Sequence, residues 1–423
     1  MSGADRTDNG GGDRPMSPSE PLSRRRQGTR IAQGARFPLG CVETPVPPVT
    51  EATTVLFADI DAMAPVDRDS LSRQGHDPFD GFYYGAVGTP SSGALARMVA
   101  GAGGAGHAVI TPAGLSAFIA ALWACVKPGQ RVLVSDAVTY SLRWHLDRRA
   151  ALAGIGVDYF PPGIGAGIAG LIRPETRLVC VESPGAFTFE VEDLAPLAAA
   201  VHTAGIRLLV DDTWSAGLHC RPIDHGADLV LYSLAKLHAG IAGVSLGAVL
   251  TNDRALYEDI LEETALQGMA VSADATQKAS VACQTLAVRL AAQDRSIRRV
   301  MAAVSAMAPA GLRLLHPAIE THPGHAIWRR DFTGAGSLFS IVVEGGSPAD
   351  AAAIGRGLAL FRPGYGWGGA VSLLSPFVAG EGRTVSCPPV DGAGLRLYVG
   401  LEDADDLAED LCAAVEQAAR AGG

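Results

Sequence analysis

Short apolar runs alternate with helical patterns from about residue 89 onward, and this alternation constrains the fold more than any other feature. Segments of helical periodicity read "SGALARMVA" and "AGLSAFIAALWACV". Five runs are apolar, rich in β-branched residues and end in polar or turn residues: "RVLVSD", "TRLVCVESP", "IRLLVDD", "DLVLYSL" and "SLGAVLTN". Runs of this kind predict buried strands joined by crossover helices, and therefore an α/β fold with a mostly parallel sheet.

The pattern changes after about residue 283. A long helical segment, 284–307, is followed by the strand-like "SLFSIVVEGG", a Gly-rich stretch "FRPGYGWGGAVSLLSP" that predicts a loop, the strand-like "GLRLYVGLED" and an acidic helix. We expect a smaller C-terminal α+β domain at 283–423, after a large domain at 89–282. Residues 1–30 are rich in Gly, Ser, Pro and charges without an apolar stretch, which predicts a flexible N-terminal tail.

Composition narrows the possible partners. With 423 residues and 48% hydrophobic content the chain can bury a large core, and its net charge of −10 comes without a basic stripe, which argues against nucleic acid. The longest apolar stretches are too short to cross a bilayer, so no membrane span is predicted. A small molecule is the expected partner.

Cysteine and histidine spacing predicts no metal site. The seven cysteines are widely separated and form no CxxC pair, which fits free thiols in a reducing cytoplasm better than disulfides or zinc. His316, His322 and His325 lie close together, but in a Pro- and Gly-containing loop without helical ligand spacing.

Three strand ends carry residues that could act together. Lys236 follows "VLYSLA", Asp211 ends "LLVD", and Gly114 follows "VITPA" at a predicted helix start. Taken singly, a strand-end lysine usually reaches solvent and a strand-end aspartate usually caps a turn. Ligands of parallel sheets bind beyond the carboxyl ends of the strands, however, and a lysine, a carboxylate and a free helix N-terminus are the parts that bind pyridoxal phosphate. A dehydrogenase-like sheet competes with this interpretation, but no GxGxxG turn follows the early strands.

The chain also resembles a known family over roughly residues 31 to 420. The resemblance is carried in order by "YYGAVGTPSSGALA", "TPAGLSA", "VESPGAFTFEVEDL", "LLVDDTWSAGLHCRPIDHGADLVLYSLAKL", "HPAIETHPGHAIWRRDFTGAGSLFS", "GYGWGGAVSLLSP" and "LRLYVGLEDADDLAEDL". These segments are similar to the Cys/Met metabolism (trans-sulfuration) family of pyridoxal-phosphate enzymes, and most of all to its cystathionine β-lyase branch. The resemblance implies fold type I, as in aspartate aminotransferase: a mostly parallel seven-stranded sheet with helices on both faces, plus the smaller C-terminal domain.

The same resemblance implies roles around the cofactor. Lys236 matches the lysine that forms the Schiff base, and Asp211 matches the partner of the pyridine nitrogen. Gly114 and Leu115 match the helix-start positions whose N–H groups hold the phosphate, and Ser233 matches a serine that also contacts it.

Substrate and subunit roles follow in the same way. Arg396 matches the arginine that binds the substrate α-carboxylate, and Trp367 lies in a "GWGG" similar to the "SWGG" of the β-lyase branch. Tyr84 matches a tyrosine that a neighbouring subunit lends to the site, and the tyrosine expected to stack on the cofactor ring falls on Thr139 with Tyr140 one place later. We therefore expect residues 31–88 to form an arm that contacts a partner subunit in a homotetramer of dimer pairs with shared sites.

Several family positions are changed. Ala86 replaces an arginine and Ala235 a threonine that would contact the phosphate, which predicts weaker cofactor binding unless other contacts compensate. Residues 240–243 and Ala370-Val371 also depart from the family pattern, so we expect a reshaped pocket.

The resemblance implies a lyase that converts cystathionine to homocysteine, pyruvate and ammonia. Three alternatives stay open at this point: elimination or replacement at Cγ, a specialised biosynthetic reaction, and a non-catalytic member that serves as a scaffold subunit. The first two use the same lysine, whereas a scaffold has no need to keep Lys236, Asp211, Tyr84 and Arg396 together.

Overall fold

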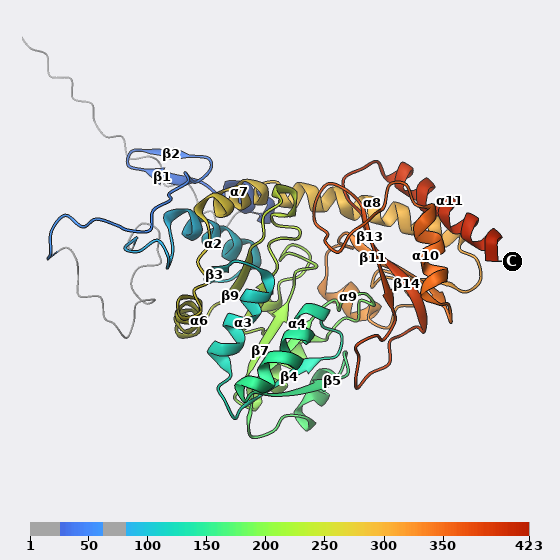
Figure 1. Cartoon of the computed structure of the whole chain (residues 1–423), viewed down its shortest axis with the longest axis horizontal. Coiled ribbons are helices and arrows are strands. Elements are labelled where there is room, and N and C mark those ends of the chain that lie inside the picture. The colour runs from blue at the N-terminus through green and yellow to red at the C-terminus, as the bar shows by residue number, and fades with distance from the viewer. Residues whose placement is uncertain (1–25, 62–81, 423) are drawn as a thin grey trace, which may run out of the picture.

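The computed structural model describes residues 26–61 and 82–422. Figure 1 shows a large unit followed by a smaller C-terminal unit, with an N-terminal segment beside the large one. Helix α1 (Gln27–Gln33) includes the last four residues of the segment predicted as tail, because Ile31 is buried against the large unit. Residues 1–25 of that predicted tail, and residues 62–81 of the predicted arm, lie outside the described residues.

The large unit is built on a seven-stranded sheet. Its strands, in spatial order, are β3 (His107–Thr111), β9 (Gly247–Thr251), β8 (Leu229–Tyr232), β7 (Arg207–Asp211), β6 (Thr176–Glu182), β4 (Arg131–Ser135) and β5 (Gly156–Phe160). Strand β9 alone runs opposite to the other six strands of this sheet, so the predicted mostly parallel sheet is confirmed. Strand β5 was missed because most of its residues stay partly exposed at the sheet edge, which leaves no continuous apolar run.

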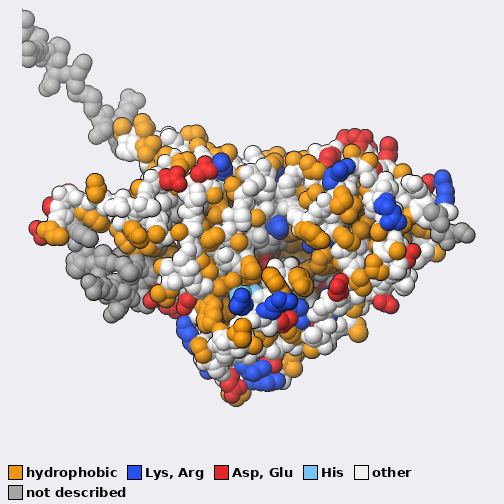
Figure 2. Space-filling model, viewed as in Figure 1, with side chains coloured by type: hydrophobic (Ala, Val, Ile, Leu, Met, Phe, Trp, Pro, Cys, Tyr) orange, Lys and Arg blue, Asp and Glu red, His pale blue; other side chains and the backbone are white. Residues whose placement is uncertain are grey.

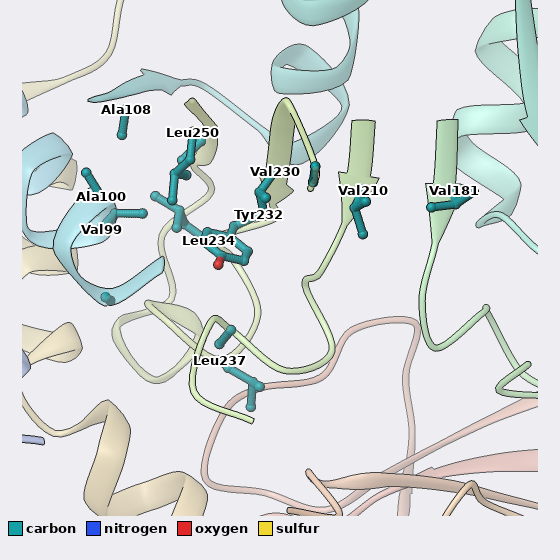
Figure 3. Close-up of a cluster of buried hydrophobic side chains, with 14 of the residues drawn as sticks. Val99, Ala100, Ala108, Val181, Val210, Val230, Tyr232, Leu234, Leu237 and Leu250 are labelled. Atoms are coloured by element: carbon teal, nitrogen blue, oxygen red, sulfur yellow. The ribbon is translucent and has the colours of Figure 1, made fainter. Parts of the chain in front are cut away.

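Helices cover both faces of this sheet, as predicted. One buried cluster joins the sheet to α2 (Pro90–Gly103), α5 (Leu194–Thr203) and α7 (Ala273–Cys283). A second cluster joins the other face to α3 (Gly114–Cys125), α4 (Tyr140–His145) and α6 (Arg254–Leu266). Successive side chains of a strand point to opposite faces of the sheet, so Val210 packs in the first cluster and its neighbour Leu209 in the second. Figure 3 shows Val181, Val210 and Val230 of the first cluster on neighbouring strands.

The C-terminal unit is an α+β structure. Helix α8 (Leu286–Met307) extends from the large unit into it (Figure 1). Its five strands, in spatial order, are β10 (Leu312–Leu315), β11 (Leu338–Glu344), β14 (Gly392–Tyr398), β13 (Leu373–Val378) and β12 (Arg362–Pro363). The remaining helices are α9 (His325–Asp331), α10 (Pro348–Gly357) and α11 (Ala404–Gly422). The Gly-rich stretch is not all loop, because β12 lies within it and β13 begins before it ends.

A short hairpin, β1 (Phe37–Leu39) and β2 (Val42–Thr44), follows α1. Within the described ranges, no helix has both the length and the apolar character needed to span a membrane. On the face shown in Figure 2, hydrophobic, acidic and basic side chains are interspersed.

Candidate active site

A cavity of about 380 Å³ lies at the carboxyl ends of the parallel strands, where the C-terminal unit faces them. Its lining includes eight of the nine residues predicted from the sequence: Lys236, Asp211, Gly114, Leu115, Ser233, Tyr140, Trp367 and Arg396. The volume is within the range of small-molecule sites. The fold therefore brings together residues from both units that are up to about 280 positions apart.

Buried neighbours hold the segment that carries Lys236. Leu234 and Leu237 are fully buried on either side of the lysine, and Figure 3 shows both in the apolar cluster. From α8, the buried Arg289 donates hydrogen bonds to the carbonyl oxygens of Leu237 (2.9 Å) and His238 (3.3 Å). These contacts fix the backbone around Lys236 and leave its side chain to point away from the core.

The amine of Lys236 has no hydrogen bond or ion pair to any described residue. Its Nζ lies 6.0 Å from the centre of the Trp367 ring. Burial lowers the pKa of Lys236 and the nearby Arg396 lowers it further, while Asp211 acts in the opposite direction. A lysine whose neutral form is favoured in this way can accept a proton or attack a carbonyl carbon.

Asp211 is held at the end of β7 by Thr213. The Thr213 hydroxyl and backbone N–H donate to one oxygen of Asp211, at 2.6 and 3.0 Å, and the other oxygen has no hydrogen bond from the described residues. Burial raises the pKa of Asp211 to about 6, and the two bonds from Thr213 only partly offset this. The free carboxylate oxygen thus lacks a cationic partner, which a protonated pyridine nitrogen would supply. Asp212, by contrast, accepts from Ser215 and Gly217 and does not line the cavity.

Thr213 also links two strand ends, since its hydroxyl accepts the backbone N–H of Ser233 at 2.9 Å. The sequence analysis missed this residue. A hydroxyl side chain two positions after a strand-end aspartate is a recognisable turn signal and could have indicated it.

Glu182 is a second carboxyl in the cavity lining, half-buried, that the sequence analysis missed. It is paired with Asp211 in the register of β6 and β7, and it accepts the Thr139 backbone N–H at 2.6 Å. Burial, and then the charge of Asp211, raise its pKa well above the usual carboxyl range. Burial therefore favours the neutral form of Glu182, and we assign the negative charge at this end of the cavity to Asp211.

The start of α3 forms a cradle for an anion. Within the described residues the N–H groups of Gly114 and Leu115 have no backbone partner, because the first intrahelical bond here is from Ala117 to Ala113. A Cβ atom at Gly114 would lie 2.7 Å from the Cβ of Ser233, so only glycine permits this close approach. A phosphate group matches these free donors and the helix dipole. The residues present therefore fit pyridoxal phosphate at both its ring nitrogen and its phosphate.

Arg396 on β14 faces the cavity from the C-terminal unit. Its guanidinium carbon lies 4.7 Å from the centre of the Phe187 ring, and no described residue forms a hydrogen bond or ion pair with it. Burial lowers the pKa of Arg396, partly offset by Glu182, but an arginine of this kind stays charged. A half-buried guanidinium that faces the cavity without an ion-pair partner is well suited to bind a substrate carboxylate.

Trp367 is placed by close backbone packing. Gly368, with φ of +101°, lies so near that a Cβ there would be 2.2 Å from the carbonyl carbon of Lys236. The Gly-rich loop can therefore press Trp367 against the lysine segment. Tyr140 begins α4 at the mouth of the cavity and is 66% exposed, beside Thr139.

Tyr84 is the exception among the predicted residues. It lies outside the cavity of its own chain, in a separate pocket that also includes Ala86, and forms a β-bridge with Thr54. Its predicted role in a neighbouring subunit's site stays a prediction. Across residues 26–61 and 82–422, no group of three or more His, Cys, Asp or Glu side chains is arranged to hold a metal.

Asn in place of Asp211 should stabilise the protein freed of its cofactor, and increasingly so at higher pH. The protonated carboxyl contributes stability below its unfolded-state pKa near 3.8, and this contribution is lost as the pH rises through about 6. The resulting difference in the free energy of unfolding between variant and wild type is about 3 kcal/mol at most. Thermal denaturation of Asp211→Asn and wild type from pH 5 to 8 measures it, with the exposed Asp274→Asn as control. A constant difference across that range would contradict the assigned pKa.

Three comparisons with known proteins show the family to which this chain belongs. A family model described as "Cys/Met metabolism PLP-dependent enzyme" matches residues 31–416. A putative cystathionine β-lyase of Rhizobium johnstonii is 32% identical over 86% of this chain and 89% of its own, and a cystathionine β-lyase of Bordetella avium is 31% identical over 88% and 92%. The crystal structure of CalE6, a methionine γ-lyase from Micromonospora echinospora, matches with a TM-score of 0.79 and 27% identity over 92% of this chain and 99% of that one.

Proposed function

Because this chain belongs to the Cys/Met metabolism family of pyridoxal-phosphate-dependent enzymes, we propose that it is a carbon–sulfur lyase that cleaves S-substituted cysteines by β-elimination. Cystathionine is the reference substrate, since the names of two relatives point to it, and would give homocysteine, pyruvate and ammonia. The observation that supports this most directly is the unpaired amine of Lys236 in one cavity with Asp211 and Arg396.

Each of these residues has a task that its surroundings favour. Pyridoxal phosphate, when bound, acts as the electron sink for the bond that breaks at Cα. Arg396 binds the α-carboxylate and orients the substrate. Lys236, with its pKa lowered, takes the Cα proton as general base. Asp211 keeps a negative charge next to the ring nitrogen, and Gly114, Leu115 and Ser233 hold the phosphate.

The phosphate has fewer side-chain contacts than the family pattern leads one to expect. Ala86 and Ala235 offer no polar side-chain atoms, and Ala86 lies outside the cavity of its own chain. Backbone donors at the start of α3 therefore carry a larger share of the binding. We propose that the complete site also includes Tyr84 of a second subunit in a homotetramer of dimer pairs.

Elimination at Cγ is the second candidate, because one similar structure is a methionine γ-lyase. The two reactions differ in their keto-acid product. Purified protein loaded with pyridoxal phosphate is incubated with cystathionine and other sulfur amino acids, and pyruvate and 2-oxobutyrate are measured. We expect pyruvate as the main product, and predominance of 2-oxobutyrate would favour γ-elimination.

A further inference from the structure

Each charged side chain that lines the cavity already has a role at its inner end, either in the proposed reaction or in a hydrogen bond within the chain. Within the described part of the chain they are Lys236, Asp211, Glu182 and Arg396. The proposed function uses Lys236, Asp211 and Arg396 for the cofactor and the amino-acid group. Glu182 is bound to the Thr139 N–H, and burial favours its neutral form. None of these four is left to bind a charge at the far end of a substrate.

Two ion pairs lie next to the mouth of the cavity. Asp136 pairs with Arg143 and accepts the backbone N–H groups of Val385 and Ser386, both at 2.9 Å. Arg383 pairs with Glu190 at 2.8 Å, and both side chains are largely buried. The hydrogen bonds to Asp136 and the Arg383–Glu190 pair connect the two units, and each charged group would lose its partner if it turned toward a ligand.

Aromatic rings provide much of the remaining wall. Phe187 stacks on Phe377, with ring centres 5.1 Å apart and an angle of 29° between the planes, and its ring also lies beside the Arg396 guanidinium. Its φ of +66° is in the left-handed region, which non-glycine residues adopt only when the surroundings compensate. The fold thus holds an aromatic ring directly next to the carboxylate site.

Two further aromatic residues continue this surface outward from Trp367. Tyr140 and Tyr365 both line the cavity, and they are 66% and 92% exposed. A substrate held by its carboxylate at Arg396, with Cα near Lys236, has Phe187 and Trp367 as the nearest rings for its side chain. The tyrosines lie farther out, at the mouth.

We propose that the preferred substrate is a cysteine whose sulfur carries an uncharged apolar group, and above all one with an aromatic ring. This inference rests on the proposed β-elimination. The Cβ–S bond breaks and its electron pair leaves with sulfur, which takes up a proton. With one water, the S-substituted cysteine gives a thiol, pyruvate and ammonium, so no oxidant or reductant is needed.

Cystathionine presents the opposite chemistry at its far end. Its distal ammonium and carboxylate would have to leave water for ring surfaces, and no described residue that lines the cavity offers them a free counter-charge, which is costly. A benzyl group instead stacks on the rings and removes apolar surface from water. We expect a preference for the benzyl compound of at least about tenfold in kcat/KM.

The first experiment measures kcat/KM by pyruvate release for S-benzyl-L-cysteine, S-methyl-L-cysteine and L-cystathionine, with the full chain loaded with cofactor. The kcat/KM for S-benzyl-L-cysteine should be at least about tenfold higher than that for L-cystathionine. An equal or higher value for cystathionine would overturn the inference while leaving β-elimination intact. No pyruvate from any of the three would overturn the proposed function itself.

A second experiment separates binding from turnover. The sulfur-free analogues 2-amino-5-phenylpentanoate and 2,7-diaminosuberate cannot eliminate a thiol, and calorimetry gives their dissociation constants. The phenyl analogue should bind at least about tenfold more tightly, and Tyr365→Ala should reduce that difference by roughly two- to tenfold. Trp144→Ala, an exposed aromatic outside the cavity lining, should leave it unchanged. Equal binding of the two analogues to the wild type would contradict the inference.

Discussion

Lys236→Ala should abolish the visible absorption band of lysine-bound pyridoxal phosphate and lower pyruvate release by at least about 10³-fold. The reason is that the variant removes both the group that attaches the cofactor and the base that takes the Cα proton. The fold should survive, because Leu234, Leu237 and Arg289 hold this segment without help from the lysine side chain. The absorption spectrum and steady-state kinetics measure the two losses.

Lys278→Ala is the matched control for this variant. Lys278 is exposed on α7 and pairs with Asp274, far from the chemistry in the proposed mechanism. It should keep both the band and the activity. A wild-type protein that stays colourless with added cofactor would favour the scaffold alternative, and a band that persists in Lys236→Ala would assign the attachment to another group.

Arg396→Leu should lower kcat/KM by at least about 10²-fold, because two charge-assisted hydrogen bonds to the substrate carboxylate contribute about 1.5–3 kcal/mol each. The visible band should remain, since the arginine does not hold the cofactor in the proposed mechanism. Arg396→Lys should recover only part of the loss, because an ammonium cannot form the planar two-point contact. Rates at saturating substrate report kcat and rates at low substrate report kcat/KM, so the two together distinguish a binding defect from a slower reaction.

Arg299→Leu serves as the control for arginine removal, since Arg299 is exposed on α8 and pairs with Asp405. An Arg396→Leu enzyme with near-normal kcat/KM would show that the α-carboxylate binds elsewhere. Loss of the visible band in that variant would instead give Arg396 a part in holding the cofactor.

Much of the site could be predicted because the fold class can be recognised from local patterns. Apolar runs that end in Asp211 or near Lys236 predict parallel strands, and the carboxyl ends of parallel strands meet at one edge of a sheet. The convergence of these residues in one cavity agrees with that prediction. Arg396 and Trp367 come from the other unit, and the local pattern did not place them there; the family resemblance did.

The contacts that tune the site could not be predicted in the same way. Arg289 supports the lysine segment from 52 residues away, and Phe187 meets Arg396 across the two units. Such pairs leave no periodicity in the sequence. Tyr84 could not be placed for a different reason, because the site to which it is proposed to contribute belongs to a second subunit.

By itself the sequence determined the α/β architecture and the smaller C-terminal unit, and it predicted which lysine and which carboxylate act together. Periodicity and turn residues encode these features locally, and the family resemblance adds the chemistry. Only the tertiary structure decided that burial favours the neutral form of Glu182, that the pKa of Lys236 is lowered and what surface meets the substrate's side chain. Those properties depend on burial and on neighbours distant in the chain, and a charge is stable or costly only according to what the fold places around it.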